Sequence, residues 1–427
     1  MTFYRNKNHI DEIRHCFPHD DMILLESQMQ EHPSSLRSFA AVQPKNWISA
    51  RENRIEQQFN GKRLSFEMNP WDALSTFRNK ISGWLFGYFG YDLKNQIEDI
   101  QSQNPAVVDL PDMYFMEPEL LFVIDSEGIR QLSGESVKIA DNLKKSIPIA
   151  VNGFEADVKK EKYVENVLGI QNHIKNGDYY ELNYSFPMVG KFDGNPYNLY
   201  QKMRQVNPVP FGAFLTIDNF SAACASPERF LQKIGSTIRS EPIKGTAERA
   251  EENQLDLLLK EELLNEKNRA ENLMIVDLVR HDMSRIAKTG SVKVSKLYDV
   301  QTFGTVHQLI SAVEAEVDEH TDPINIIKSC FPMGSMTGAP KIEVMKFIDR
   351  FEHYKRGLYS GAVGYFTPED DFDFNVVIRT AIMQNGRLVY PVGGAITSDS
   401  IPEKEWEETE IKSRSITKVL EKDVIRS

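Results

Sequence analysis

The stretch YSGAVGYFTPEDDFDFNVVIRTAIMQNGRLVYPVGGAIT (residues 359–397) decides the expected fold, because it contains three apolar runs separated by short polar segments. These runs are YSGAVGYF (359–366), FNVVIRTAIM (374–383) and RLVYPVGGAIT (387–397). Runs of this length that are rich in β-branched and aromatic residues are typical of β-strands, and the residues between them favour turns. The stretch therefore predicts successive strands joined by tight turns.

The rest of the chain adds helices to this predicted sheet. Residues 271–287 and 401–422 have the spacing of apolar side chains that is typical of helices. Residues 162–188 read as a helix, a Gly-Asp turn and a strand. Strands in runs, with helices outside them, indicate an α+β fold rather than alternating βαβ units.

The N-terminal part is expected to be rich in strands. It contains short apolar runs bounded by Gly, Pro, Asn and Asp. A more polar, turn-rich stretch at residues 134–162 is the expected boundary. It would separate an N-terminal sheet-rich region (1–150) from a second, catalytic region (155–425).

Composition argues against several classes of protein. The chain has 427 residues, 41% of them hydrophobic, and a formal net charge of −12. No nucleic acid partner is expected, since a phosphate-binding surface needs a basic footprint. No membrane span or signal peptide is expected either, because no apolar run approaches roughly 20 residues and the N-terminus is polar. Three widely spaced cysteines without a C-x-x-C pattern favour a reducing, cytoplasmic compartment.

Lys244 lies in the run SEPIKGTAERA (240–250), at the end of a segment that reads as a short strand. A phosphate-binding loop needs the order G-x-x-x-x-G-K-[ST], whereas this lysine precedes Gly245. A surface or ion-paired lysine is the ordinary alternative. Pro242 and Ile243 make the neighbourhood apolar, and a lysine desolvated there has a reason to lose its proton and become a nucleophile. These residues alone leave the ion pair and the nucleophile open.

Two predicted helices place carboxylates on faces that otherwise look buried. Glu271 shares a helical face with Ile275, one turn later. Glu405, Glu408 and Lys412 follow one another at three- and four-residue steps. Such spacing fits salt bridges along a helix, worth only about 0.2–0.5 kcal/mol per pair. It fits a hard-cation site equally well, because Mg²⁺ takes one or two protein carboxylates and accepts substrate oxygens.

A third group of residues suits an anion. Arg379 lies within an apolar run, where an unpaired guanidinium would be costly, and its planar fork matches a carboxylate. The turns PVGGAIT (391–397) and CFPMGSMTGAPK (330–341) contain small residues whose backbone amides could face an anion. His307, in an apolar run, fits either a hydrogen-bonded core histidine or a general acid/base.

Taken together, these motifs resemble the chorismate-utilising enzymes, the family of anthranilate synthase component I. The resemblance runs from about residue 160 to 422, and a weaker match covers the N-terminal part through LLES (24–27) and GYFGYDL (87–93). The ordered motifs are GDYYELNYS (177–185), NPVPFGAFL (207–215), ASPERF (225–230), PIKGT (242–246), AENLMIVDLVRHD (270–282), VHQLIS (306–311), FPMGSMTGAPK (331–341), RGLYSGAVGY (356–365), FNVVIRT (374–380), GGAITSDS (393–400) and EWEET (405–409). The resemblance implies a large two-sheet antiparallel β sandwich with helices packed outside and an active site in a cleft of the catalytic core.

The resemblance also implies a role for each matching position. Mg²⁺ would be held by Glu271, Glu405 and Glu408 and would bridge to the ring carboxylate of chorismate. The residues expected to hold or line the substrate are Thr246, Ser335, Tyr359, Arg379, Gly393, Gly394 and Lys412. Glu228 corresponds to the general acid/base that helps the C4 hydroxyl leave, and His307 to a histidine near the departing or developing charge.

Lys244 marks the branch of this family. Relatives that form anthranilate or isochorismate resemble Pro-x-Ala-Gly at this point, whereas those that form aminodeoxychorismate resemble Pro-Ile-Lys-Gly-Thr. The resemblance then implies that the lysine attacks C2 of chorismate as the C4 hydroxyl leaves, and that ammonia adds at C4 and expels the lysine. Glu181 stands where isochorismate and salicylate synthases carry a water-activating lysine, which disfavours water addition. The expected product is 4-amino-4-deoxychorismate, a precursor of para-aminobenzoate and folate.

Four positions depart from the family pattern. Glu181 replaces the usual glutamine, Tyr184 a leucine, His281 the asparagine of the RND motif, and Ala395 a third glycine. Glu181 is the departure expected to matter, because it adds a carboxylate near the side from which nitrogen is delivered. The other three look like changes in the supporting residues.

A separate glutamine amidotransferase subunit is the expected partner. The segments around Cys16, Cys224 and Cys330 do not resemble a glutaminase nucleophile elbow, and no amidotransferase region or fused lyase is recognised in the chain. Ammonia would therefore come from a second subunit, and a separate lyase would complete para-aminobenzoate.

Three alternatives stay open. Glu26 and Ser27, with NPVPF (207–211), resemble the place where tryptophan binds in some relatives, although core strands and turns are the preferred interpretation. Anthranilate synthase component I shares the expected magnesium and substrate groups but should lack Lys244. A non-catalytic homologue that senses chorismate or tryptophan would need no nucleophile.

Overall fold

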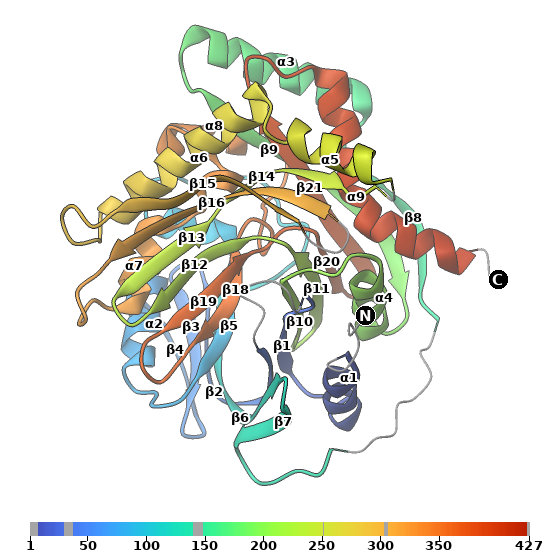
Figure 1. The fold of residues 1–427 in the computed structure, drawn as a ribbon. Helices are drawn as coiled ribbons and strands as arrows, with labels where there is room; N and C mark the ends of the chain where they lie inside the picture. Colours follow the sequence, from blue (N-terminus) through green and yellow to red (C-terminus); the bar gives the residue numbers. More distant parts are fainter. Residues whose placement is uncertain (1–6, 30–36, 140–147, 251, 303–305, 425–427) are drawn as a thin grey trace.

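The computed structural model describes residues 7–29, 37–139, 148–250, 252–302 and 306–424, which form a broad curved sheet with helices outside it (Figure 1). The strands form one continuous antiparallel ladder that folds back on itself, and its two halves are called here the first and second arms. In spatial order the first arm consists of β8 (Ala150–Ala156), β9 (Glu181–Asp193), β21 (Arg387–Ile396), β20 (Thr380–Gln384), β11 (Phe220–Ser226), β10 (Phe211–Ile217) and β1 (Met22–Glu26). The short strand β17 (Gly338–Ala339) pairs with the start of β9.

The second arm continues the same ladder. It consists of β5 (Leu85–Phe89), β18 (Ala362–Phe366), β19 (Phe372–Val376), β12 (Arg229–Ile234), β13 (Thr237–Glu241) and β16 (Val306–Glu316), and β16 also pairs with β14 (Ile243–Glu248) and β15 (Lys293–Thr302). The long strands β2 (Ser38–Arg51) and β6 (Met113–Asp125) join the arms, since β2 pairs with β1 and β6 pairs with β5. The hairpin strands β3 (Arg54–Phe59) and β4 (Lys62–Glu67) extend from β2, and β7 (Gly128–Ser133) pairs with β6.

The N-terminal region and the rest of the chain share this ladder. Strand β1 pairs with β10, and β5 pairs with β18. Residues 140–147 of the expected boundary stretch lie outside the described residues, and β8 follows them. Strands β1, β2, β6 and β5 thus lie between β10 and β18, which come later in the sequence.

Side-chain alternation explains the layers of the molecule. On β5, Phe86 and Tyr88 belong to the core between the arms together with Leu215 of β10, whereas Leu85 and Phe89 face outward. Successive side chains of a strand point to opposite faces of the sheet, and both faces of β5 are buried, so its side chains are apolar on both faces. The helices then cover the outer faces, which confirms the predicted α+β sandwich with helices outside.

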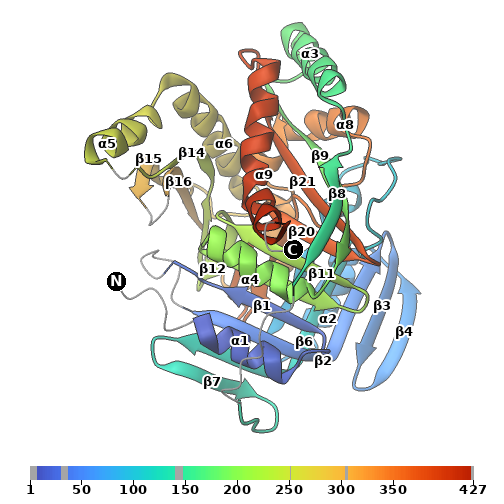
Figure 2. The ribbon, with the colours of Figure 1, turned by 90° about the vertical axis from the view of Figure 1, so that its right-hand side faces the viewer.

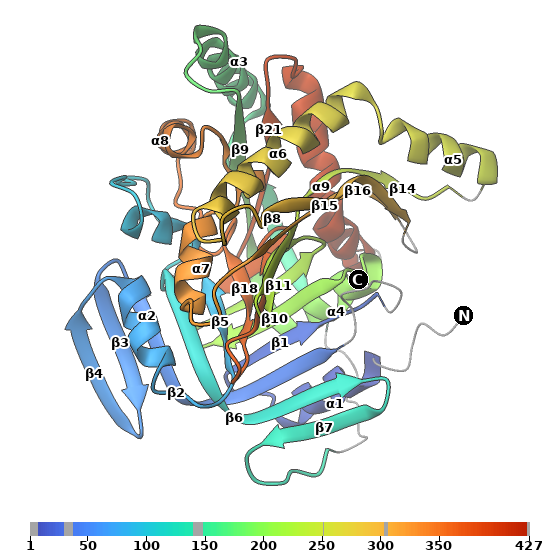
Figure 3. The same cartoon turned by 60° about the vertical axis from the view of Figure 1, so that its left-hand side comes forward.

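Each arm has its own set of helices (Figures 2 and 3). The first arm is covered by α1 (Lys7–Cys16), α4 (Pro196–Val206) and α9 (Pro402–Val424), and the second by α2 (Pro70–Arg78), α6 (Glu266–Ser284) and α7 (Pro323–Cys330). Two more, α3 (Lys160–Asn176) and α8 (Lys341–Phe351), pack with β9 and β21, and α5 (Asn253–Glu262) has no buried residue. The 3₁₀ turns are η1 (Tyr91–Gln96) and η2 (Gly334–Met336). Among the helices described, none is long and apolar enough to cross a membrane.

Two predicted elements show how well the local pattern works. The predicted helix, turn and strand at 162–188 are confirmed as α3 and β9, and Gly177 ends the helix at φ +84°, a left-handed value that favours glycine. The single strand predicted at 374–383 is wrong, because β19 ends at Val376 and β20 begins at Thr380. The chain crosses from the second arm to the first at this break, so both halves of the run are apolar.

Candidate active site

Two segments cross between the arms next to each other, and each carries a predicted site residue. Glu228 lies between β11 and β12, and Arg379 lies between β19 and β20. The N–H of Val376 donates to the Glu228 carbonyl (3.0 Å), and the N–H of Ala225 donates to the Arg379 carbonyl (3.1 Å). Arg379 has φ +51°, which is uncommon for a residue other than glycine. Broken strands therefore place a carboxyl group and a guanidinium at the crossing.

Lys244 of β14 lies between carboxylates from two other elements. Its Nζ is 3.2 Å from Oε1 of Glu181, the first residue of β9, and 3.8 Å from Oε2 of Glu271 on α6. The Lys244 side chain is 12% exposed and that of Glu181 only 1%. Residues far apart in the sequence thus meet around one buried amine.

The charges around Lys244 decide its protonation. Burial by itself lowers the pKa of Lys244, but the carboxylates of Glu181 and Glu271 outweigh burial and hold this pKa above its ordinary value. Burial also raises the pKa of Glu271, and Lys244 opposes that shift. The expectation that burial would release the lysine proton is therefore wrong for this arrangement, because two carboxylates stabilise the cation.

Helix α9 brings further carboxylates over Gly394. Lys412 Nζ lies 2.7 Å from Glu408 Oε1 and donates to the Gly393 carbonyl at 3.0 Å. A β-carbon at Gly394 would lie 3.7 Å from Glu408 Oε1 and 3.8 Å from Glu405 Oε2. The glycine thus leaves open a space that faces both carboxylates.

Lys267 links the carboxylates of α6 and α9. Its Nζ lies 3.8 Å from Glu271 Oε1 and 3.7 Å from Glu405 Oε1. Burial raises the pKa of Glu405 and the charge of Glu408 adds to that shift, whereas Lys412 lowers the pKa of Glu408. Gathered carboxylate oxygens beside an open glycine fit a hard cation such as Mg²⁺. Within the described ranges, no three carboxylate, histidine or cysteine side chains are grouped closely enough to hold one ion.

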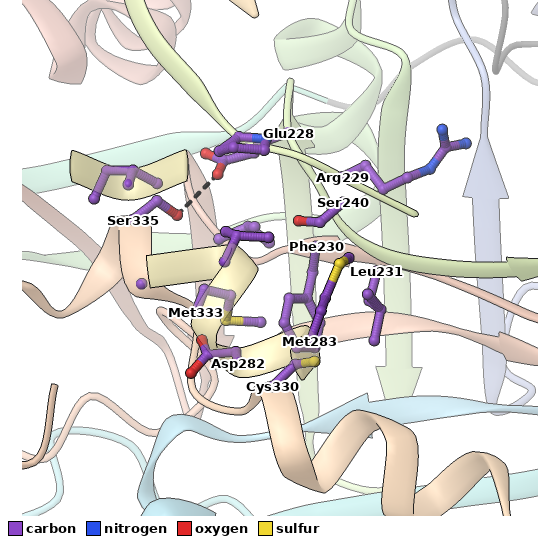
Figure 4. Close-up of a pocket in the computed structure, with 15 residues that line it drawn as sticks. Glu228, Arg229, Phe230, Leu231, Ser240, Asp282, Met283, Cys330, Met333 and Ser335 are labelled. Atoms are coloured by element: carbon purple, nitrogen blue, oxygen red, sulfur yellow. Dashed lines mark hydrogen bonds between the residues drawn. The ribbon is translucent and has the colours of Figure 1, made fainter. Parts of the chain in front are cut away.

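Glu228 is buried beside a serine from another element (Figure 4). Ser335 of η2 donates its hydroxyl to Glu228 Oε1 at 2.8 Å. Burial raises the pKa of Glu228 to about 7, although the Ser335 hydrogen bond and the charge of Lys244 lower it. A carboxyl group that titrates near neutral pH suits proton transfer. A cavity lined mostly by apolar side chains, among them Met283 and Met333, adjoins this pair.

Arg379 and Tyr359 differ in how they could meet a substrate. Arg379 forms no salt bridge with any residue that the structure describes; burial lowers its pKa, and Tyr390 and Glu228 oppose this shift. A guanidinium without a carboxylate partner suits an anionic ligand. Tyr359 is 3% exposed and belongs to the hydrophobic core of the second arm, and its ring centre lies 5.9 Å from the Arg356 guanidinium carbon.

His307 and Thr246 differ in burial, since His307 is 2% exposed whereas Thr246 is exposed. Both ring nitrogens of His307 have partners at 2.9 Å, Nε2 with Asp256 Oδ1 and Nδ1 with Thr302 Oγ1. His307 pairs across the ladder with Ala247, and Asp256 belongs to α5, so these contacts fix α5 against the sheet. Thr246 is exposed on β14.

A buried ion pair fixes two segments of the site. Arg356 Nη2 lies 2.6 Å from Glu352 Oε1, and both side chains are 1% exposed. Arg356 also donates to the backbone carbonyls of Asn183 (2.8 Å) and Met336 (2.7 Å). The start of β9 and the turn η2 are therefore held relative to each other by one guanidinium.

Replacing Arg356 with methionine should lower the free energy of unfolding by about 3–5 kcal/mol, since the Glu352 charge would stay buried without its partner. Urea denaturation followed by circular dichroism measures this loss. Arg350→Met on the exposed side of α8 is the matched control, with an expected loss of at most about 1 kcal/mol, because its guanidinium carbon lies 4.8 Å from the centre of the Phe347 ring. Equal losses in both variants would contradict the assigned role.

Some residues that shape the site were missed in the sequence. Lys267 is four residues before Glu271, a helical spacing that could have indicated it. Asp256 and Arg356 gave no comparable signal, because Asp256 meets His307 across 51 residues and Arg356 meets Asn183 across 173. Such contacts depend on the folded sheet.

Comparisons with known proteins agree with this arrangement. A family model described as chorismate binding enzyme matches residues 20–418. Aminodeoxychorismate synthase component 1 of Bacillus subtilis (strain 168) is 30% identical over 93% of this chain and 91% of its own length. Anthranilate synthase component 1 of Aquifex aeolicus is 33% identical over 93% of this chain and 89% of its own. The probable aminodeoxychorismate synthase, chloroplastic, of Oryza sativa subsp. japonica is 35% identical over 79% of this chain, which spans only 43% of that relative.

Solved structures share the fold. Anthranilate synthase component I from Streptococcus pneumoniae superposes with a TM-score of 0.79 at 27% identity, covering 91% of this chain and 93% of that one. The menaquinone-specific isochorismate synthase from Escherichia coli has a TM-score of 0.74 at 15% identity, covering 94% and 88%, which shows the fold alone. The family model spans most of the sequence, and full-length relatives reach 30% identity or more. The chain therefore belongs to the family of chorismate binding enzymes.

Proposed function

We propose that this chain is the synthase component of an aminodeoxychorismate synthase, which converts chorismate and ammonia to 4-amino-4-deoxychorismate. The observation that carries the proposal is the buried Lys244 amine, 3.2 Å from Glu181 and 3.8 Å from Glu271, in a family of chorismate binding enzymes. Relatives named aminodeoxychorismate synthase component 1 support this activity. The product would serve para-aminobenzoate and folate synthesis.

Binding of chorismate would depend on the cations and amides around the crossing. Chorismate carries two carboxylates, and Arg379 has the unpaired guanidinium that would hold one of them. Lys412 and the backbone of Gly393 and Gly394 would hold the other end of the molecule. The remaining positions proposed to line the substrate are Thr246, Ser335 and Tyr359.

The chemistry proposed for Lys244 is covalent catalysis in two displacements. The Lys244 ammonium first gives one proton to the Glu181 carboxylate, 3.2 Å away. The neutral amine then bonds to C2 of chorismate while the C4–O bond breaks, and Glu228 gives its proton to the leaving hydroxyl, which departs as water. Ammonia bonds to C4 while the C2–N bond to Lys244 breaks, so the lysine leaves as an amine and takes its proton back from Glu181, and the new ammonium group at C4 returns a proton to Glu228. Chorismate and ammonia thus give aminodeoxychorismate and water. His307 would lie near the charge that develops as the hydroxyl leaves. Its hydrogen bonds to Asp256 of α5 and to Thr302 hold its ring in place.

A magnesium ion is proposed at the carboxylates Glu271, Glu405 and Glu408. When bound, it would supply an electrophile and a template for a substrate carboxylate. The support for this assignment is the space over Gly394, which faces Glu405 and Glu408, because Mg²⁺ takes only one or two protein carboxylates.

Ammonia is proposed to come from a separate glutaminase subunit. The relatives from Bacillus subtilis and Klebsiella aerogenes are named component 1, and this name supports a second component. Free ammonium salts would replace that subunit in an assay.

Anthranilate synthesis is the second candidate, because relatives with that name are equally similar. The two reactions differ in pyruvate, which anthranilate formation releases and amination at C4 does not. Purified protein with chorismate, Mg²⁺ and an ammonium salt should consume chorismate without forming pyruvate, measured with lactate dehydrogenase. Stoichiometric pyruvate would overturn the proposed function in favour of anthranilate synthesis.

A pH profile tests the acid role of Glu228. Because its pKa is raised to about 7, Glu228 carries the proton below that pH, and turnover should fall as the pH rises through about 7. Glu228→Gln should lower turnover by about 10²–10⁴-fold and remove this limb of the profile. Ser335→Ala removes a hydrogen bond that favours the charged form, so the limb should move to higher pH. If turnover of Glu228→Gln still fell as the pH rises through about 7, this fall would belong to the titration of another group.

A further inference from the structure

Helix α5 has no buried residue, yet it carries a carboxylate that contacts the buried ring of His307. The helix lies at the outer edge of the molecule, beside β14 (Figures 2 and 3). The side chain of its Asp256 is 14% exposed, whereas that of His307 is 2% exposed. Most helices in proteins are stabilised by packing of an apolar face, which α5 does not bury. The polar contact of Asp256 is therefore a main link between this helix and the sheet.

The Asp256 carboxylate is held by donors from the segment that precedes α5. Arg249 Nε donates to both carboxylate oxygens at 2.9 Å, and the N–H of Ala250 donates to Oδ1 at 3.0 Å. The hydrogen bond from Arg249, together with those from Ala250 and His307, holds the pKa of Asp256 well below its ordinary value, although burial opposes this shift. The carboxylate therefore stays ionised, and an ionised carboxylate can only accept hydrogen bonds.

An acceptor of this kind decides where His307 carries its hydrogen. Asp256 Oδ1 lies 2.9 Å from Nε2, and because the carboxylate has no hydrogen to donate, Nε2 must be the donor. The other ring nitrogen, Nδ1, lies 2.9 Å from the hydroxyl of Thr302, which can donate or accept. His307 can therefore gain or lose a proton at Nδ1 while it keeps both hydrogen bonds.

The surroundings of this ring connect it to the strand that carries the proposed nucleophile. Asp256, held by Arg249, is the charged group that the described contacts place against the ring, since Thr302 of β15 is uncharged. The ladder partner of His307 on β14 is Ala247, three residues after Lys244. A proton gained or lost at Nδ1 would thus change the charge beside β14.

We propose that Asp256 is a positioning residue for the amination reaction. It holds His307 with a hydrogen on Nε2, so that Nδ1 is the one ring nitrogen whose proton can come and go. This inference rests on the proposed function, in which His307 lies near the charge that develops as the C4 hydroxyl leaves. An amide in place of the Asp256 carboxylate could donate as well as accept, so it would no longer select one tautomer.

Nitrogen NMR of the histidine rings tests the tautomer directly. The chain is labelled with isotopically enriched histidine, and the signals of His307 are identified by their loss in His307→Gln. In the wild-type chain Nε2 should carry its hydrogen at every pH measured, and only the Nδ1 signal should report a change of protonation. In Asp256→Asn both nitrogens should show the averaged signals of mixed tautomers. A wild-type ring with its hydrogen on Nδ1 and none on Nε2 overturns the inference.

Steady-state kinetics with chorismate and an ammonium salt test the role in the reaction. Asp256→Asn should lower kcat by about 100-fold, the lower end of the range for positioned proton transfer, while the KM for chorismate stays within about threefold. Asp256→Glu keeps a carboxylate and should recover part of this loss. Glu12→Gln is the matched control and should keep the wild-type kcat, because Glu12 pairs with His9 at 3.0 Å on α1.

The outcomes separate this inference from the proposed function. A wild-type kcat in Asp256→Asn, or a lower kcat with an unchanged His307 tautomer, overturns the positioning role and leaves the proposed function intact. The expected tautomer and its loss in Asp256→Asn, in a protein that forms anthranilate or no product, support the assignment of Asp256 and reject the proposed function.

Discussion

Replacing Lys244 with alanine is expected to lower the rate of amination by about 10³-fold or more, the scale of losing a nucleophile. Chorismate should still bind with a dissociation constant within about threefold of wild type, because Arg379 and Lys412 remain. Product formation measured by chromatography and mass spectrometry gives the rate, and calorimetry gives the affinity.

Two further variants separate the nucleophile from its charge. Lys244→Arg keeps the cation between Glu181 and Glu271 but removes the amine, so it should be as inactive as the alanine variant. Lys296→Ala, which removes an exposed lysine paired with Asp299 at 3.2 Å, should be unaffected. Recovery of turnover in Lys244→Arg would make the role of the lysine electrostatic, and unchanged turnover in Lys244→Ala would remove it altogether.

Replacing Glu271 or Glu408 with alanine is expected to abolish activity and the response of turnover to magnesium. The affinity for Mg²⁺ should fall by at least about 100-fold. These carboxylates come from α6 and α9, and the proposed ion would join the two helices through them. Turnover measured against Mg²⁺ concentration, with chorismate and ammonium saturating, gives both quantities.

Glu407 provides the control for that experiment. It precedes Glu408 on α9 and is likewise exposed, but unlike Glu408 it forms no salt bridge with any residue that the structure describes. Glu407→Ala should therefore keep both turnover and the wild-type magnesium requirement. A Glu271→Ala or Glu408→Ala variant that remains active and still responds to magnesium would refute the metal assignment.

The layers of the fold were largely predictable, whereas the crossings between arms were not. Alternating side chains and turn residues predicted strands in runs, and Gly177 marked the end of α3. The run at 374–383 was wrongly predicted as one strand. Its two halves belong to different arms and both are buried, so hydrophobicity does not change at the break between β19 and β20. The break depends on pairing with β12 and β11, which no local pattern contains.

The candidate site was predictable in its residue types but not in its electrostatics. Motifs singled out Lys244, Glu228 and Glu271, and the structure brings charges from all three into one region. That the lysine is held protonated follows from Glu181, which lies 63 residues away in the sequence. A contact between residues so far apart in the sequence depends on how β9 and β14 lie in the folded sheet. The burial of Lys244 was therefore predictable from its apolar neighbours, whereas its pairing with the Glu181 carboxylate was not.

Product analysis in the presence and absence of a downstream lyase tests the central claim most directly. Purified chain with chorismate, Mg²⁺ and an ammonium salt near pH 7 should form a product in which an amine has replaced the C4 hydroxyl, identified by mass spectrometry. Para-aminobenzoate should appear only after the lyase is added. Fluorescent anthranilate formed directly, without the lyase, would contradict the account and assign the chain to anthranilate synthesis.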